Sequence, residues 1–122
     1  MQNILIADDS ADLPAIVRSI YSRRNIFISE ATSKAELLSS LSRMRPDLIL
    51  LDVILDSDDG RVLCKELKLS DDYKTIPIIL ISGDPEKLLD PQEVFADGIL
   101  QKPFRVESVL SKIKEVINKY AS

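Results

Sequence analysis

Five short apolar runs, separated by amphipathic segments, are the feature that most limits how this chain can fold. The runs are continuous rather than alternating, and they occupy residues 4–7, 26–28, 48–51, 78–81 and, more weakly, 99–100. A continuous apolar run of this length is typical of a parallel strand that helices cover on both faces. The sequence therefore predicts five strands in one open, mostly parallel sheet.

The segments between the runs have the spacing of amphipathic helices. Their apolar stripes are Leu13, Ile16, Val17, Ile20 and Tyr21; Leu63, Cys64 and Leu67; and Val106, Val109, Leu110, Ile113 and Ile117. Ser33 and Glu36 match a capping box at the start of a further helix. Strands that alternate with helices predict an α/β fold, a doubly wound (βα)5 domain with helices on both faces of the sheet. On this reading Cys64 is a buried core thiol.

Residue counts exclude several kinds of chemistry. None of the 122 residues is a histidine, so the chain has no histidine base, no histidine metal ligand and no phosphohistidine of its own. A single cysteine excludes a disulfide framework and a thiolate zinc site. The three glycines lie at positions 60, 83 and 98, too far apart for a GxGxxG or a P-loop motif. Oxygen ligands are the chemistry that remains.

The charge and the length predict a single domain over residues 1–122, located in the cytoplasm. The net charge is -4, from 20 acidic and 16 basic residues, which argues against binding to nucleic acid or to an anionic membrane. No apolar stretch approaches the ~20 residues that span a bilayer, and the N-terminus lacks the basic region of a signal peptide. Because nothing follows the last helix, we expect the output to be protein–protein contact.

Polar residues follow the apolar runs at the points where the strands should end. Asp8 and Asp9 follow the first run, Asp52 the third, Ser82 the fourth and Lys102 the fifth. In open α/β sheets, sites form outside the carboxyl ends of the strands, where the strand order reverses. The sequence therefore predicts that three carboxylates, a hydroxyl and an ammonium group meet at one edge of the sheet.

Such a cluster of carboxylates needs a cation. Two like charges ~4 Å apart repel each other by about 4 kcal/mol at an effective dielectric constant near 20. A hard divalent ion with oxygen ligands, such as Mg²⁺, relieves this repulsion, and Lys102 adds a second positive charge. A site with both is suited to a phosphoryl group, with Asp52 as a possible nucleophile.

These residues resemble the receiver domain of two-component response regulators. The matching features are the Asp8-Asp9 pair, Asp52 with Gly60 eight residues later, Ser82 at the end of the fourth run, and Lys102-Pro103-Phe104. The resemblance covers almost the whole chain, and four features in the right order make it specific. It implies a flavodoxin-like fold with the strand order 2-1-3-4-5.

The resemblance also implies roles. Asp52 would accept a phosphoryl group from the phosphohistidine of a sensor histidine kinase or a histidine phosphotransfer protein. Mg²⁺ would be bound by Asp9 directly, Asp8 through water, Asp52 and the backbone carbonyl of Ile54. Ser82 and Lys102 would hold the phosphoryl group, and the Lys102–Pro103 peptide bond would be cis. The chain would be a signalling protein that phosphorylates and dephosphorylates itself at most, rather than an enzyme.

Three positions depart from the family pattern. Ile99 occupies a position where many receivers have a switching Tyr or Phe, so the usual relay from Ser82 to an aromatic ring is not available. The Asp84-Pro85 and Asp90-Pro91 pairs each combine an N-cap residue with a first-turn proline, which predicts that the fourth helix is broken or shortened. Asp56 stands where the family often has proline, and the acidic segment it belongs to, residues 56–59, lacks the ligand spacing of an EF-hand and is interpreted as a solvated rim.

Two other functions remain open at this stage. The chain could be a receiver-like interaction module that works without phosphorylation, which Ile99 and the broken fourth helix favour slightly. It could also be a small-molecule phosphatase with an aspartyl-phosphate intermediate. The haloacid-dehalogenase type of such enzymes needs a second Asp two residues after the nucleophile, where this chain has Ile54.

Overall fold

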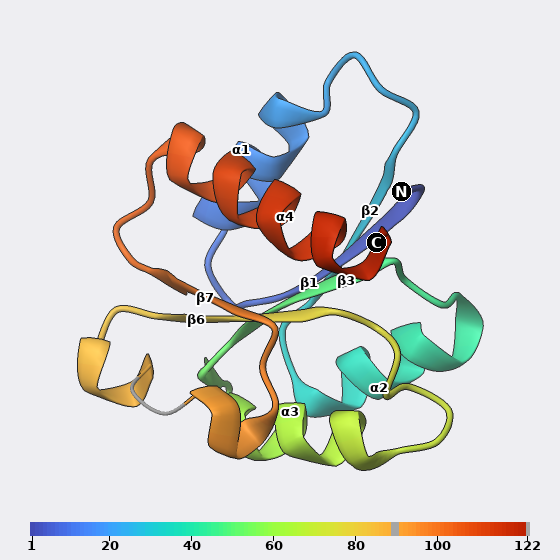
Figure 1. Ribbon diagram of the computed structural model, residues 1–122, viewed down its shortest axis with the longest axis vertical. Coiled ribbons are helices and arrows are strands. Elements are labelled where there is room, and N and C mark those ends of the chain that lie inside the picture. Colours follow the sequence, from blue (N-terminus) through green and yellow to red (C-terminus); the bar gives the residue numbers. More distant parts are fainter. Residues whose placement is uncertain (89–90, 122) are drawn as a thin grey trace.

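The computed structural model describes residues 1–88 and 91–121, and its centre is a five-stranded parallel sheet (Figure 1). The strands stand in the order β2-β1-β3-β6-β7, which confirms the predicted doubly wound, flavodoxin-like order. Their bounds are β1 (Asn3–Ala7), β2 (Phe27–Ala31), β3 (Leu48–Asp52), β6 (Ile78–Ser82) and β7 (Gly98–Gln101).

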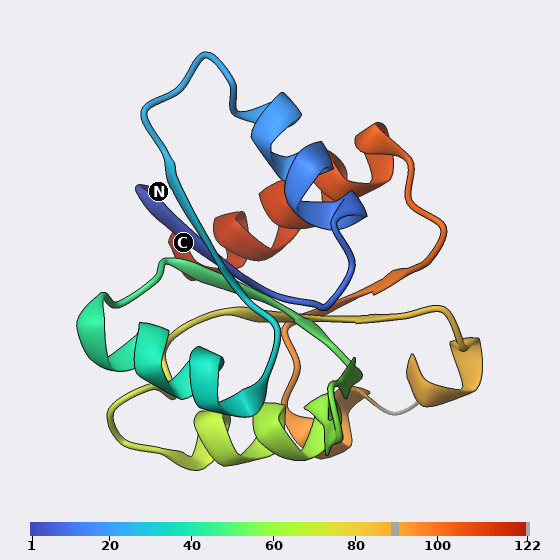
Figure 2. The same cartoon turned by 180° about the vertical axis from the view of Figure 1, so that it is seen from behind.

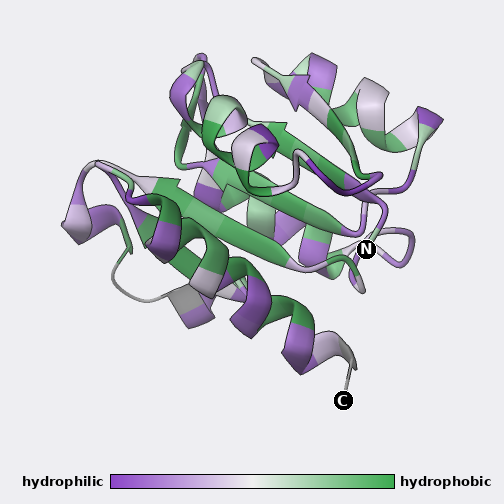
Figure 3. Ribbon diagram, turned by 90° about the horizontal axis from the view of Figure 1, so that it is seen from above, coloured by the Kyte–Doolittle hydropathy of each residue, from purple (hydrophilic) through white to green (hydrophobic). Residues whose placement is uncertain are grey.

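Two helices cover each face of the sheet. Figures 1 and 2 show α1 (Asp12–Ile20) and α4 (Val106–Ala121) on one side, and α2 (Lys34–Arg43) and α3 (Gly60–Leu69) on the other. Figure 3 shows apolar strands between helices whose outer faces are polar. None of the helices in the described part of the chain is long and apolar enough to cross a bilayer.

The central strand β3 explains why the apolar runs are continuous. Leu48 and Leu50 pack into the core beneath α1 and α4, whereas Ile49 and Leu51 pack into the core above α2 and α3. All four side chains are fully buried. Because successive side chains of a strand point to opposite faces, a strand covered on both faces must be apolar at every position.

The edge strand β2 differs from its prediction in extent. The apolar run ends at residue 28, but the strand continues to Ala31 because each residue of β1 pairs with one of β2, from Asn3 with Phe27 to Ala7 with Ala31. As an edge strand, β2 is partly exposed and tolerates the polar residues Ser29 and Glu30.

The helix starts follow the predicted signals with two adjustments. α1 begins at Asp12 rather than at residue 10 or 11, and the Ser10 hydroxyl accepts a hydrogen bond from the Asp12 amide. At α2 the Ser33 hydroxyl accepts from the Glu36 amide at 3.2 Å, as expected. The Glu36 carboxylate accepts from the amide of Thr32, one residue before the N-cap, so the capping box is completed one residue earlier than predicted.

The fourth helix is replaced by two short 3₁₀ helices, η1 (Pro85–Leu88) and η2 (Pro91–Val94), as the prolines predicted. Asp84 caps η1 by accepting a hydrogen bond from the Glu86 amide at 3.0 Å. The corresponding prediction for Asp90 lies outside the described residues. The thiol of Cys64 is buried and donates to the Val94 carbonyl, which confirms the predicted core thiol.

The acidic segment after β3 forms a small hairpin of β4 (Ile54–Leu55) and β5 (Asp58–Asp59). Asp56 at its tip is exposed and has a φ of 56°. Asp59 is the N-cap of α3 and pairs with Arg61 at 3.0 Å. The segment is a rim, as predicted, but Asp59 also has a structural role that the prediction omitted.

Candidate functional site

The carboxyl ends of four neighbouring strands place the predicted site residues at one edge of the sheet. Asp8 directly follows β1, Asp52 ends β3, Ser82 ends β6, and Lys102 directly follows β7. In the sheet register, Asp52 pairs with Ile81. Ser82 in turn pairs with Gln101, the residue before Lys102. The strand order thus brings together side chains that lie far apart in the sequence.

Lys102 connects the two buried carboxylates. Its Nζ lies 2.7 Å from Asp52 Oδ2 and 3.5 Å from Asp8 Oδ1. Burial lowers the pKa of the Lys102 ammonium, but the hydrogen bond to Asp52 and the charge of Asp8 outweigh this effect and raise the pKa on balance. Lys102 is therefore a fixed cation beside Asp52, and about 30% of its side chain remains exposed.

Asp8 is the most deeply buried acidic group of the site. Its Oδ1 accepts a hydrogen bond from the Ser10 amide at 3.1 Å, whereas its Oδ2 is buried and has no hydrogen-bond partner among the described residues. Burial, together with the nearby Asp52 carboxylate, raises the pKa of Asp8 to about 6, despite the Ser10 bond and Lys102. A buried carboxylate oxygen without a partner is a free ligand position.

The carboxylates fit a divalent cation. Asp8, Asp9 and Asp52 each offer an oxygen, and these atoms lie within 4.8 Å of one another. Asp8 and Asp52 are buried, whereas Asp9 is exposed. Carboxylate oxygens are the ligands that Mg²⁺ and Ca²⁺ prefer. The Ile54 amide donates to Asp52 Oδ1 at 2.8 Å, which places this residue at the site; coordination by its carbonyl stays a prediction.

Ser82 and the cis proline lie where the resemblance implied. Ser82 is almost fully buried, and its hydroxyl accepts a hydrogen bond from the Asp84 amide at 3.0 Å. The Lys102–Pro103 peptide bond is cis, as expected. Ile99, at the position of the missing aromatic, is half-buried and packs against the core above α2 and α3.

Gly60 has a role that the sequence analysis did not derive. A Cβ at this position would lie 2.0 Å from the backbone oxygen of Asp52. The Gly60 amide also donates to the Val53 carbonyl at 2.6 Å. The start of α3 is therefore in direct contact with the backbone that carries Asp52. The glycine eight residues after Asp52 was the available signal, but spacing alone does not reveal a close backbone approach.

We expect Asp8→Asn to stabilise the metal-free protein at pH 7 by up to about 3 kcal/mol. Because the pKa of Asp8 is raised from 3.8 to about 6, the folded chain holds this proton to a higher pH than the unfolded chain does. The free energy of unfolding therefore falls as the pH rises from about 4 to about 6, and the variant lacks this fall. Urea unfolding in EDTA across this range measures the difference. A variant less stable than its parent at pH 7 would contradict the expectation.

A sequence model of the response regulator receiver domain matches residues 4–114. The chain belongs to this family. Receiver domains of response regulators are signalling modules that histidine kinases phosphorylate, and this chain has their fold.

Individual relatives agree with the family match. The heme response regulator HssR of Staphylococcus epidermidis is 34% identical over 98% of this chain and 53% of its own length. The chemotaxis protein CheY of Halobacterium salinarum is 28% identical over 95% of this chain and 97% of its own length.

Solved receiver structures also superpose on this chain. The signal receiver domain of a signal transduction histidine kinase from Syntrophus aciditrophicus has a TM-score of 0.82 at 30% identity, over 98% of this receiver and 92% of that chain. The receiver spans about half the length of several curated relatives, HssR among them.

Proposed function

We propose that this receiver accepts a phosphoryl group on Asp52 from the phosphohistidine of a sensor histidine kinase or a histidine phosphotransfer protein, in a reaction that requires Mg²⁺. The observation that carries the proposal is the ion pair between Lys102 Nζ and Asp52 Oδ2 at 2.7 Å. Asp8, with its unpartnered buried oxygen, lies beside this pair. A nucleophilic carboxylate, a fixed cation and an open ligand position are the parts that phosphoryl transfer needs.

The reaction forms one bond and breaks another. A carboxylate oxygen of Asp52 attacks the phosphorus atom, and the P–N bond to the donor imidazole breaks. Its electron pair returns to the imidazole nitrogen, which takes a proton from solvent. The donor histidine lies outside these 122 residues, which contain none.

Each residue of the site has a definite task in the proposed transfer. Asp8, Asp9, Asp52 and the Ile54 carbonyl would hold Mg²⁺, which when bound neutralises the charge on the phosphoryl oxygens. The Lys102 ammonium, already beside Asp52, pairs with a second phosphoryl oxygen, and the Ser82 hydroxyl donates to a third.

A hollow of about 610 Å³ beside the site gives the donor protein a place to dock. It lies between the start of α1 and the segment after β7, and Ser10, Ile16, Lys102 and Phe104 are among the residues that line it. Its lining combines apolar side chains with one acidic residue, Asp12, and one cation, Lys102, a mixture that suits a protein surface. The hollow reaches Lys102 and therefore the edge of the phosphoacceptor site.

We propose that residues 1–122 form a single receiver domain. The domain acts in the cytoplasm and signals through contacts with other proteins. The two 3₁₀ helices replace the fourth helix of the family, so the surface presented to an output partner is remodelled. Among the relatives, YxdJ of Bacillus subtilis is a transcriptional regulatory protein, and this chain covers 52% of its length.

Mg²⁺ is expected to raise the thermal unfolding midpoint by several degrees. At a Mg²⁺ concentration 100 times its Kd, preferential binding to the folded state contributes about 2.7 kcal/mol. Asp52→Asn should lose most of this shift because it removes a ligand charge. Asp56→Asn is the matched control, since Asp56 is exposed at the hairpin tip. Equal shifts in the Asp52→Asn variant and its parent would contradict the metal site.

A further inference from the structure

A hollow of about 450 Å³ lies between the carboxyl-terminal end of α1, with the loop after it, and residues 110–118 of α4. It is at the amino end of the sheet, opposite Asp52. Its floor is apolar, with half-buried side chains of Ile20, Leu110 and Ile117 among the lining residues. The volume is within the range of small-molecule sites.

The rim of this hollow is positively charged. Arg24, in the loop after α1, and Lys114, on α4, both line it, and none of its lining residues is acidic. This is unusual for a chain with a net charge of -4. Within the described residues, neither charged head group makes a hydrogen bond or an ion pair. Both cations are therefore free to bind an anion.

Tyr21 adds a hydrogen-bond donor to the same wall. Its side chain is almost fully buried and lines the hollow, yet its hydroxyl makes no hydrogen bond within residues 1–88 and 91–121. Arg24 follows in the same turn, where its amide donates to the Tyr21 carbonyl at 2.9 Å, and both side chains line the hollow. The hydroxyl oxygen is not among the fully buried atoms that lack a partner, so it is open to the hollow and can donate to a ligand there.

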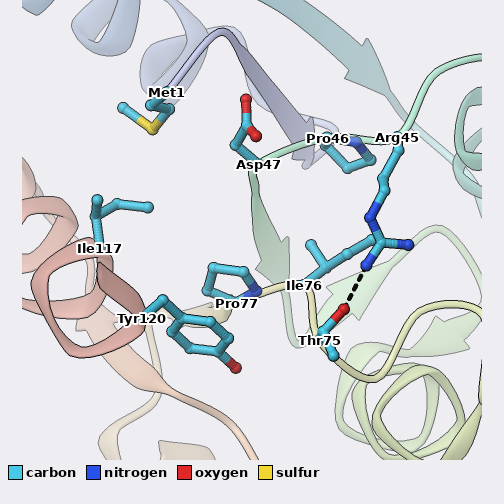
Figure 4. A pocket seen from close by; sticks show the side chains of 9 residues that line it. All are labelled: Met1, Arg45, Pro46, Asp47, Thr75, Ile76, Pro77, Ile117 and Tyr120. Carbon is cyan, nitrogen blue, oxygen red and sulfur yellow. Dashed lines mark hydrogen bonds between the residues drawn. The ribbon is translucent and has the colours of Figure 1, made fainter. Parts of the chain in front are cut away.

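The charged side chains of the neighbouring hollow, in contrast, already have hydrogen-bond partners. It has a volume of about 400 Å³ and shares Met1 and Ile117 with the first (Figure 4). Its charged residues are already engaged: Asp47 accepts hydrogen bonds from two backbone amides, and Arg45 donates to Thr75 and to a backbone carbonyl. Of these two hollows, the one between α1 and α4 is therefore the one with side-chain donors that are unpaired among the described residues.

We propose that the α1–α4 hollow binds a small anionic ligand with an apolar body, of the alkyl or aryl carboxylate class. The apolar body lies on the isoleucine and leucine side chains of the floor. Arg24 and the Tyr21 hydroxyl hold the carboxylate, and Lys114 faces it from α4. The site lies at the opposite end of the sheet from Asp52, and its occupant stabilises the contact between α1 and α4.

Octanoate, below its micelle-forming concentration, is a suitable probe for the full chain. Methyl NMR spectra should show saturable shifts at Ile20, Leu110 and Ile117, and no comparable shifts near Phe104 or Ile54. Octanol and octylammonium have the same chain length without the negative charge, so they should bind at least about threefold more weakly.

Two variants and a matched control locate the anion. Arg24→Ala should raise the Kd for octanoate about three- to tenfold, and Tyr21→Phe, which removes only the hydroxyl, about two- to fivefold. Arg23→Ala should leave the Kd unchanged, since Arg23 is exposed in the same loop but does not line the hollow. Equal losses for Arg23→Ala and Arg24→Ala, equal binding of octanol, or no saturable shifts would each overturn the proposal.

Discussion

Gly60→Ala is expected to destabilise the protein by about 3 kcal/mol or more. The new methyl group would lie 2.0 Å from the backbone oxygen of Asp52 and 3.0 Å from the Cα of Val53. Backbone atoms at the buried end of β3 cannot rotate away as a flexible side chain can, so α3 or the strand end must move. Urea unfolding measures the loss of stability.

Gly83→Ala is the matched control for this effect. It also lies at the carboxyl edge of the sheet, but a Cβ there meets only the Lys102 Cβ at 3.9 Å, an ordinary contact. Its effect should stay within about 1 kcal/mol. If both alanine variants had the same stability, the close approach of α3 to Asp52 would be wrong.

Lys68→Ala is expected to cost about 3 kcal/mol, at the opposite end of the sheet. Lys68 Nζ donates to Asp97 Oδ2 at 2.9 Å and to the Tyr120 hydroxyl at 2.7 Å, and only 8% of the lysine side chain is exposed. Burial lowers the pKa of Lys68, but bonds to Tyr120 and Asp97 raise it on balance. The variant leaves Asp97, whose side chain is only 19% exposed, without its cation, which is the costly part of breaking such a pair.

An exposed ion pair provides the comparison. Lys74 and Asp71 lie 3.2 Å apart with side chains that are 54% and 95% exposed. Lys74→Ala should therefore change the free energy of unfolding by less than about 1 kcal/mol. Denaturant unfolding of both variants at the same pH tests the contrast. Equal effects of the two substitutions would contradict a buried network that joins α3, Asp97 (the residue before β7) and α4.

Local patterns were sufficient to predict most of the architecture. The continuous apolar run at residues 48–51 predicted a strand buried on both faces, and the two prolines at 85 and 91 predicted the broken fourth helix. The strand-end residues Asp8 and Asp52 were predicted to meet because the carboxyl ends of parallel strands share one edge.

Features that depend on tertiary packing could not be predicted in this way. Lys68 is 29 residues from Asp97 and 52 from Tyr120, and the sequence contains no sign that these three side chains meet. The contact between Gly60 and the Asp52 backbone depends on how α3 packs at the end of β3. Pairing with β1 extends β2 beyond its apolar run, so a neighbouring strand, rather than β2 itself, determines that boundary.

The most direct test of the proposed function is the intact mass of the protein after incubation with acetyl phosphate and Mg²⁺. The proposal predicts the addition of one phosphoryl group, which is absent in Asp52→Asn and in EDTA. Asp59→Asn is a matched acidic control outside the carboxylate cluster and should still be phosphorylated. Phosphorylation that persists in Asp52→Asn would contradict the assigned acceptor. No phosphorylation from acetyl phosphate or from a phosphohistidine donor would instead favour an interaction module that works without phosphate.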